Sequence, residues 1–331
     1  MSFRTNDAAC ATSPHSSPCP ACMPVPLITT SVFALVVLHA STWPVHRIWG
    51  EAGHRITAQA ASAALPADMP RFFRDAAPQL AYLNPEPDRW KERAEGSRDQ
   101  ALDGGSSPDH FLDLEMIPPA ERARALAARD RYAFTAQLRA GGVDPSKAGA
   151  LPFAMLELTQ RLRVAFRQWR VAPNDTQRAW IEARIVNDAG ILGHYVADAS
   201  NPAHTTIHYN GWVGENPEGY ATDNRFHGRF ESAFVQARVQ LADVQPAVVA
   251  SPNQFETLRP AIVEYFMRTH GEVERLYRLD KASPFNGSNT TPANKAFAVE
   301  RLAAGATMLR DLWWTAWITS APVATEPRDA R

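Results

Sequence analysis

Apolar residues recur at steps of three and four along most of the chain that follows residue 49. This spacing places them on one face of an α-helix, whereas the alternation typical of half-buried strands is scarce. Pro, Gly and Asn residues gather in the connections between these segments and favour turns there. The pattern predicts an all-α fold, with a single compact multi-helix domain over residues 49–331. The segments expected to be helical are 55–65, 120–140, 151–170, 176–199, 226–241, 257–279 and 294–318.

The first 48 residues differ from the rest of the chain. A polar stretch rich in Pro and Ser runs into the apolar segment 27–40, which is short for a membrane span. We interpret residues 1–48 as an export leader, with 1–40 as the alternative boundary and an uncleaved anchor as the alternative interpretation. All three cysteines lie in this leader, so the exported domain would contain none. These features predict a bacterial protein that is periplasmic or secreted.

The charge balance limits how this protein can attract a phosphate. The 331 residues carry a formal net charge of -1, and 45% of them are hydrophobic, which is enough for a substantial core. Such a chain has no general basic field for nucleic acid or for an anionic membrane. Any attraction for phosphate must therefore be local, and bound metal cations would provide it.

Histidine and carboxylate residues occur in pairs at helical spacing. His194 and Asp198 lie one turn apart in GHYVADASNPAHTTIHYNGW, where an Asn-Pro break precedes His204, and His227 and Glu231 repeat the spacing in FHGRFES. Residues i and i+4 share a helix face, so each pair can bind one ion from a rigid platform. A single histidine–carboxylate pair at this spacing is more often a surface contact, but two such pairs favour a metal site. Imidazole and carboxylate without thiolate suit zinc, with manganese or iron as alternatives.

Further candidate ligands precede these pairs along the chain. WGEAGH contains Trp49 and His54, NPEPDRWK contains Asp88, and PDHFLDLE contains His110 and Asp113. Together with the histidine and carboxylate pairs, these motifs resemble the single-strand-specific zinc nucleases, which share a superfamily with the bacterial zinc-dependent phospholipases C. The resemblance runs from Trp49 to about residue 231 and fixes nine positions in order.

The resemblance implies a cluster of two to three zinc ions at the bottom of a cleft. Two cations about 3.5–4 Å apart can share a hydroxide and clamp the attacked phosphate. The first ion would be bound by Asp88, His110, His194 and Asp198, and the second by His204, His227 and Glu231. The third would be bound by the terminal amine and carbonyl of Trp49, by His54 and by the other oxygen of Asp198.

Four residues near the expected ligands are candidates for catalysis or substrate binding. Asp113 can orient the hydroxide or contact the substrate, or it can cap a helix or turn. Phe111 can stack on a base of a single strand, with a core position as the alternative. Arg89 or Lys91 can contact a phosphate oxygen, with solvated surface charge as the alternative.

Three functions remain open from the sequence. The first is a zinc-dependent endonuclease that hydrolyses single-stranded DNA and RNA to 5′-nucleotides. The second is a zinc-dependent phospholipase C. A glutamate at position 231 is more similar to the phospholipase branch, because the nuclease branch usually has aspartate there. The spacings from Trp49 to His54 and from His204 to His227 are more similar to the nucleases. The third is a metal-stabilised binding protein without turnover. We expect a monomer that requires no protein partner.

Overall fold

Helices make up nearly all the regular structure of this chain. The computed structural model describes residues 50–288 and 291–321, and these ranges contain no β-strand. The predicted all-α fold is therefore confirmed. None of the described helices is long and apolar enough to cross a membrane. The predicted leader, residues 1–48, and the predicted ligand Trp49 lie outside the described residues.

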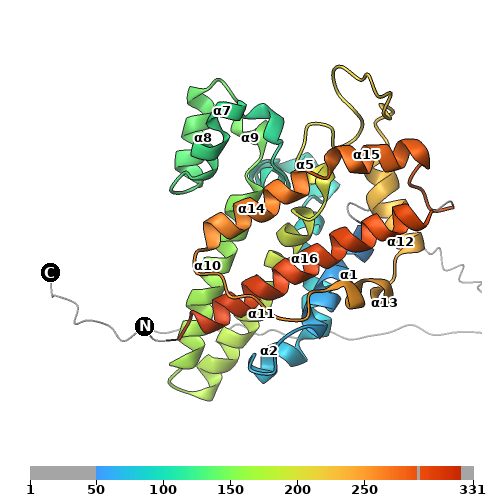
Figure 1. The fold of residues 1–331 in the computed structure, drawn as a ribbon. Coiled ribbons are helices and arrows are strands. Elements are labelled where there is room, and N and C mark those ends of the chain that lie inside the picture. Colours follow the sequence, from blue (N-terminus) through green and yellow to red (C-terminus); the bar gives the residue numbers. More distant parts are fainter. Residues whose placement is uncertain (1–49, 289–290, 322–331) are drawn as a thin grey trace, which may run out of the picture. The chain divides into compact units, whose positions relative to one another are not determined.

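Four long helices form the centre of the domain (Figure 1). They are α1 (Gly50–Ala63), α10 (Leu151–Arg170), α11 (Asp175–Asp198) and α16 (Pro292–Ile318). Helix α10 packs along α11, and α16 contacts the other three helices. Phe73 and Trp313 are fully buried in this core, with ring centroids 5.3 Å apart in an edge-to-face contact. Large aromatic side chains of this kind contribute much of the buried apolar area.

Shorter helices surround the central four. On the amino-terminal side they are α2 (Arg71–Asp75), α3 (Ala77–Leu83), α4 (Glu86–Arg89), α5 (Arg93–Arg98), α6 (Ala101–Ser106), η1 (Ser107–His110), η2 (Leu114–Met116), α7 (Pro119–Leu126), α8 (Arg131–Ala140) and α9 (Pro145–Ala148). After α11 come η3 (Pro202–His204), η4 (Gly228–Phe234), α12 (Val235–Arg238), α13 (Leu241–Val244), η5 (Gln245–Ala247), α14 (Leu258–His270) and α15 (Val273–Ala282).

Two of the expected helices are interrupted in the structure. The segment 120–140 divides into α7 and α8 because the Asp130 side chain accepts a hydrogen bond from the Ala133 amide and starts a new helix. The segment 257–279 divides into α14 and α15 after Gly271 ends the first helix. Each of these segments therefore forms two short helices rather than one long one.

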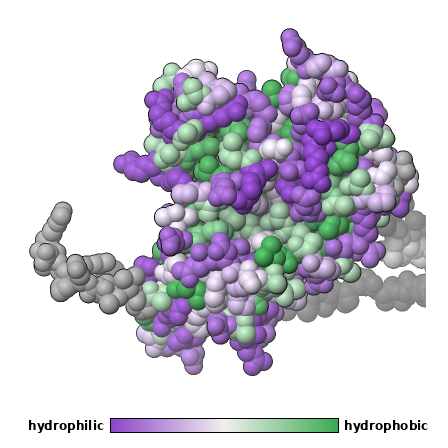
Figure 2. All heavy atoms as spheres, in the orientation of Figure 1, coloured by the Kyte–Doolittle hydropathy of each residue, from purple (hydrophilic) through white to green (hydrophobic). Residues whose placement is uncertain are grey.

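The outer face formed by α14 and α16 is mixed in polarity. Figure 2 shows hydrophilic residues over most of this face and hydrophobic residues gathered near its middle. A groove of about 740 Å³ lies between the two helices and the segment that precedes α14, with Val249, Tyr265 and Met308 among its lining residues. It contains none of the histidines described below.

Candidate metal centre

The end of α11 holds the first pair of candidate ligands. His194 and Asp198 are fully buried, and His194 Nε2 lies 3.2 Å from Asp198 Oδ2. After Asp198 the chain turns, and the Asn201 side chain caps η3 by accepting a hydrogen bond from the Ala203 amide. This turn brings His204 back beside the helix end, where its Nδ1 lies 3.7 Å from Asp198 Oδ1.

The first group of candidate ligands comes from three separate helical segments. It consists of Asp88 on α4, His110 on η1 and His194, whose ligand atoms all lie within 4.8 Å of one another. His110 Nδ1 is 2.9 Å from His194 Nε2, and Asp88 Oδ1 lies 3.7 Å from His110 Nδ1. The resemblance implied that these three residues and Asp198 surround one ion, and Asp198 Oδ2 does lie 3.1 Å from His110 Nδ1 and 3.2 Å from His194 Nε2.

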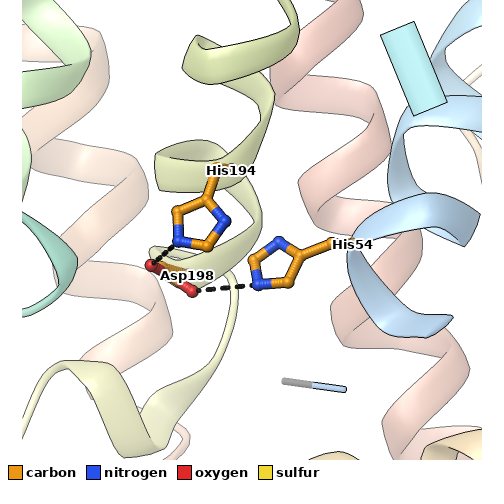
Figure 3. Close-up of side chains that lie close together, drawn as sticks. All are labelled: His54, His194 and Asp198. Carbon is orange, nitrogen blue, oxygen red and sulfur yellow. Dashed lines mark ion pairs between the residues drawn. The ribbon is translucent and has the colours of Figure 1, made fainter. Parts of the chain in front are cut away.

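The second group has two of its three residues on α11. His54 on α1 joins His194 and Asp198, again with ligand atoms within 4.8 Å (Figure 3). His54 Nε2 faces Asp198 Oδ1 at 3.5 Å, while Asp198 Oδ2 faces His110 Nδ1 at 3.1 Å. The two oxygens of one carboxylate thus face different groups, which is the arrangement that a bridging ligand requires.

The third group lies where the chain adopts a π-helix. His204, His227 and Glu231 have ligand atoms within 4.8 Å of one another. Glu231 is fully buried in η4, with Oε2 2.8 Å from His227 Nε2 and Oε1 3.0 Å from His204 Nε2. The Asn201 side chain also donates a hydrogen bond to Glu231. Short π-helices occur often at functional sites.

The electrostatic state of these residues fits a bound cation. Burial lowers the pKa of His54 to about 3 and that of His110 to about 4, so both imidazoles are neutral at pH 7. Burial opposes ionisation of Asp198 and Glu231, but the facing histidines hold the pKa of Asp198 well below its usual range and lower that of Glu231 to about 2. Neutral His54 and His110 beside ionised carboxylates suit a bound divalent cation, whereas His204, whose pKa Asp198 and Glu231 raise to about 10, must release a proton to bind one.

Unpartnered buried atoms support the same conclusion. His54 Nε2 and Asp198 Oδ1 are buried and make no hydrogen bond within the described part of the chain. Leaving such atoms unpaired costs free energy, so their presence calls for a partner. An ion held between these two atoms would satisfy both of them.

A cleft of about 930 Å³ opens onto the first and third groups. His110, His204 and His227 line it, together with three of the predicted substrate-contacting residues, Lys91, Phe111 and Asp113. Arg89 does not line it. Its guanidinium lies 2.7 Å from the Glu86 carboxylate and 4.5 Å from the Tyr82 ring centroid.

Two cleft residues have distinctive environments. Asp113 is buried, and burial together with nearby Glu115 raises its pKa to about 7. Phe111 is half-buried and passes close to Gly149, which has a φ of +86°. A Cβ atom at Gly149 would lie only 2.1 Å from the Phe111 carbonyl oxygen, so only glycine fits here. This close crossing fixes the backbone that carries the Phe111 ring.

Sequence patterns missed two polar residues of the centre. Asn201 donates to Glu231, and the fully buried Asn84 contacts both His54 and His194. The Asn-Pro break was visible in the sequence, but its contact with Glu231 was not. Comparisons with family models, with curated proteins and with solved structures found no match to this chain.

Proposed function

We propose that the protein is a zinc-dependent phosphodiesterase that hydrolyses single-stranded DNA and RNA and releases 5′-nucleotides. The observation that supports this most strongly is the set of adjacent candidate metal-binding groups, two of which reach one cleft, with Asp198 facing two groups. Neighbouring metal sites are typical of enzymes that hydrolyse phosphate esters. A structural zinc site is normally a single closed set of four ligands, which does not need a cleft.

Zinc is the cation that we assign to these groups. The donors are imidazoles and carboxylates, and the described residues include no cysteine. Bound zinc would polarise a phosphoryl oxygen and lower the pKa of a bound water towards neutrality. The resemblance of the motifs to the zinc nucleases agrees with this assignment.

The cleft residues provide the remaining interactions with substrate. The Lys91 ammonium lies 3.3 Å from Asp88 Oδ1, close enough to the first group to contact a phosphate oxygen there. Asp113 has a pKa of about 7, so at neutral pH it can accept or donate a proton. Phe111 and the exposed Tyr209 offer aromatic surfaces on the cleft wall. Bases that are unpaired in a single strand can stack on such rings.

The test compares substrates and one aromatic variant. Phe111→Ala should raise KM for oligonucleotides about 5- to 150-fold, because stacking contributes roughly 1–3 kcal/mol per base. KM for a small chromogenic phosphodiester should stay nearly constant, since that ester needs only the metal centre. Tyr132→Ala is the matched control, because Tyr132 is 80% exposed and does not line the cleft.

The outcomes separate the candidate functions. Rapid cleavage of single strands with slow cleavage of duplex DNA supports the proposal. Equal cleavage of both forms would contradict the stacking contribution. Hydrolysis of phosphatidylcholine alone would identify a phospholipase C, and zinc binding without any hydrolysis would identify a binding protein.

A further inference from the structure

One buried asparagine links candidate ligands on two different helices. Asn84 lies at the carboxyl end of α3, is fully buried and does not line the cleft. Its side-chain Oδ1 lies 3.0 Å from His54 Nδ1, and its main-chain oxygen lies 2.9 Å from His194 Nδ1. The two imidazole rings stack nearly parallel, with centroids 4.1 Å apart, so their Nδ1 atoms reach the same residue.

These contacts select a tautomer for each histidine. A carbonyl oxygen can only accept a hydrogen bond, so His194 Nδ1 carries the proton and Nε2 keeps its lone pair. The Asn84 oxygen imposes the same state on His54, whose Nε2 then faces Asp198 with a free lone pair. If the amide nitrogen faced His54 instead, the proton would move to Nε2 and block metal binding there.

The neighbouring helix is shaped to admit this asparagine. A Cβ atom at Gly193 would lie 2.3 Å from Asn84 Nδ2, and one at Gly190 would lie 2.4 Å from the Leu83 Cβ. A glycine inside a helix costs about 1 kcal/mol relative to alanine. Two of them in the carboxyl-terminal half of α11 therefore allow the end of α3 to approach closely, and this approach puts Asn84 beside both imidazoles.

We propose that Asn84 is a positioning residue whose side chain holds His54 in the tautomer that can bind a metal ion. Its main chain does the same for His194. The identity of the ion rests on the proposed function, whereas the tautomers do not. A change of the Asn84 side chain should therefore affect the metal position at His54 and leave His194 unchanged. Hydrogen-bonding partners of this type commonly change metal affinity 10- to 100-fold.

The experiment measures tautomers and zinc binding in three variants. In metal-free protein labelled with ¹⁵N-histidine, Asn84→Ala should give a mixture of tautomers at His54 and retain the Nδ1-protonated form at His194. Zinc titration should show about 10- to 100-fold weaker binding at His54 only. Asn84→Asp should retain the wild-type tautomers, because a carboxylate also accepts from Nδ1. Asn294→Ala, which removes a buried asparagine hydrogen-bonded to Ser283, is the control for general destabilisation.

Several results would overturn the inference. An unchanged His54 tautomer and zinc response in Asn84→Ala would do so, as would equal weakening at every zinc position. If the alanine variant fails to fold, the aspartate variant decides alone, and an Nε2-protonated His54 in it would refute the role. A protein that shows these tautomer effects but cleaves no nucleic acid would refute the proposed function and leave this inference intact.

Discussion

Replacing Asp198 with asparagine should remove the charge that two groups of the centre share. Asp198 is fully buried, with one oxygen 3.5 Å from His54 and the other 3.1 Å from His110. The amide keeps the volume of the side chain but is neutral and offers a single acceptor oxygen. We expect the variant to lose at least two zinc equivalents, whereas changes at Asp88 or Glu231 should affect one group each.

The metal-free variant should also titrate differently at His204. Burial opposes a charge on His204, but Asp198 and Glu231 raise its pKa to about 10. The Asp198 oxygen lies 3.7 Å away, and opposite charges near this distance interact by about 4 kcal/mol at an effective dielectric constant of about 20. That energy corresponds to about 3 pKa units. The variant should therefore lower the pKa of His204 by about 2–3 units.

The sign of the stability effect follows from this shift. Because the pKa of His204 is raised on folding, its proton stabilises the native state fully below about pH 6.5, and this stabilisation is lost as the pH rises through the folded-state pKa. In Asp198→Asn the loss should be complete about 2–3 pH units lower, because only the folded-state pKa changes. The contribution of His204 to the free energy of unfolding should therefore be smaller at pH 8 than in the native protein.

The assay combines metal analysis of dialysed protein with histidine titration by NMR in the metal-free state. Asp188→Asn is the matched control, because Asp188 is a buried acid on the same helix that pairs with Arg161 at 3.1 Å and belongs to none of the metal-binding groups. A normal zinc content in Asp198→Asn, or an unchanged pKa at His204, would refute the bridging role.

Three further changes test the same centre. Chelation should abolish activity and lower the Tm in calorimetry, since each ion at 100 times its Kd stabilises the fold by about 2.7 kcal/mol, and an unaffected protein would contradict this. Asp113→Asn should raise the free energy of unfolding at pH 8 but not at pH 4. The pKa of Asp113 is raised to about 7, so its carboxyl group is protonated at pH 4 and carries a destabilising buried charge at pH 8, which the amide removes. Gly149→Ala should destabilise the fold and raise KM for oligonucleotides more than the control Gly142→Ala. Gly142 also has a positive φ, but a Cβ atom there would have no other atom within 4 Å. Equal effects of the two substitutions would contradict the role assigned to the close contact between Gly149 and Phe111.

The long helices were predictable because their apolar periodicity covers several turns. The segment 151–170 coincides with α10, and 176–199 differs from α11 by one residue at each end. The short helices between residues 71 and 110 were not predicted, because four to seven residues are too few to establish a period. The π-helix at η4 was also missed, since its hydrogen-bonding pattern leaves no mark on the spacing of apolar residues.

The candidate ligands were predictable to the extent that their spacing is local. His194 with Asp198 and His227 with Glu231 lie one turn apart on helices, and both pairs converge in the structure. Asn84 left no such signal, because its contacts cross 30 and 110 positions of the chain. Neighbouring side chains in one motif can also diverge, as Lys91 reaches the cleft while Arg89 does not. Which of these two side chains reaches the cleft depends on how the short helix α4 packs, and the sequence does not show that.

The wide sequence separation within the centre has a consequence for the order of folding. His110 meets His194 across 84 positions, and His204 meets Glu231 across 27. Each such contact closes a loop whose entropic cost must be met before the contact contributes stability. A growing chain that has not yet exposed η4 would have His204 and His227 but lack Glu231, so the third group would be incomplete. The complete centre can therefore assemble only after synthesis has passed residue 231, although the central helix α16, at Pro292–Ile318, follows later in the chain.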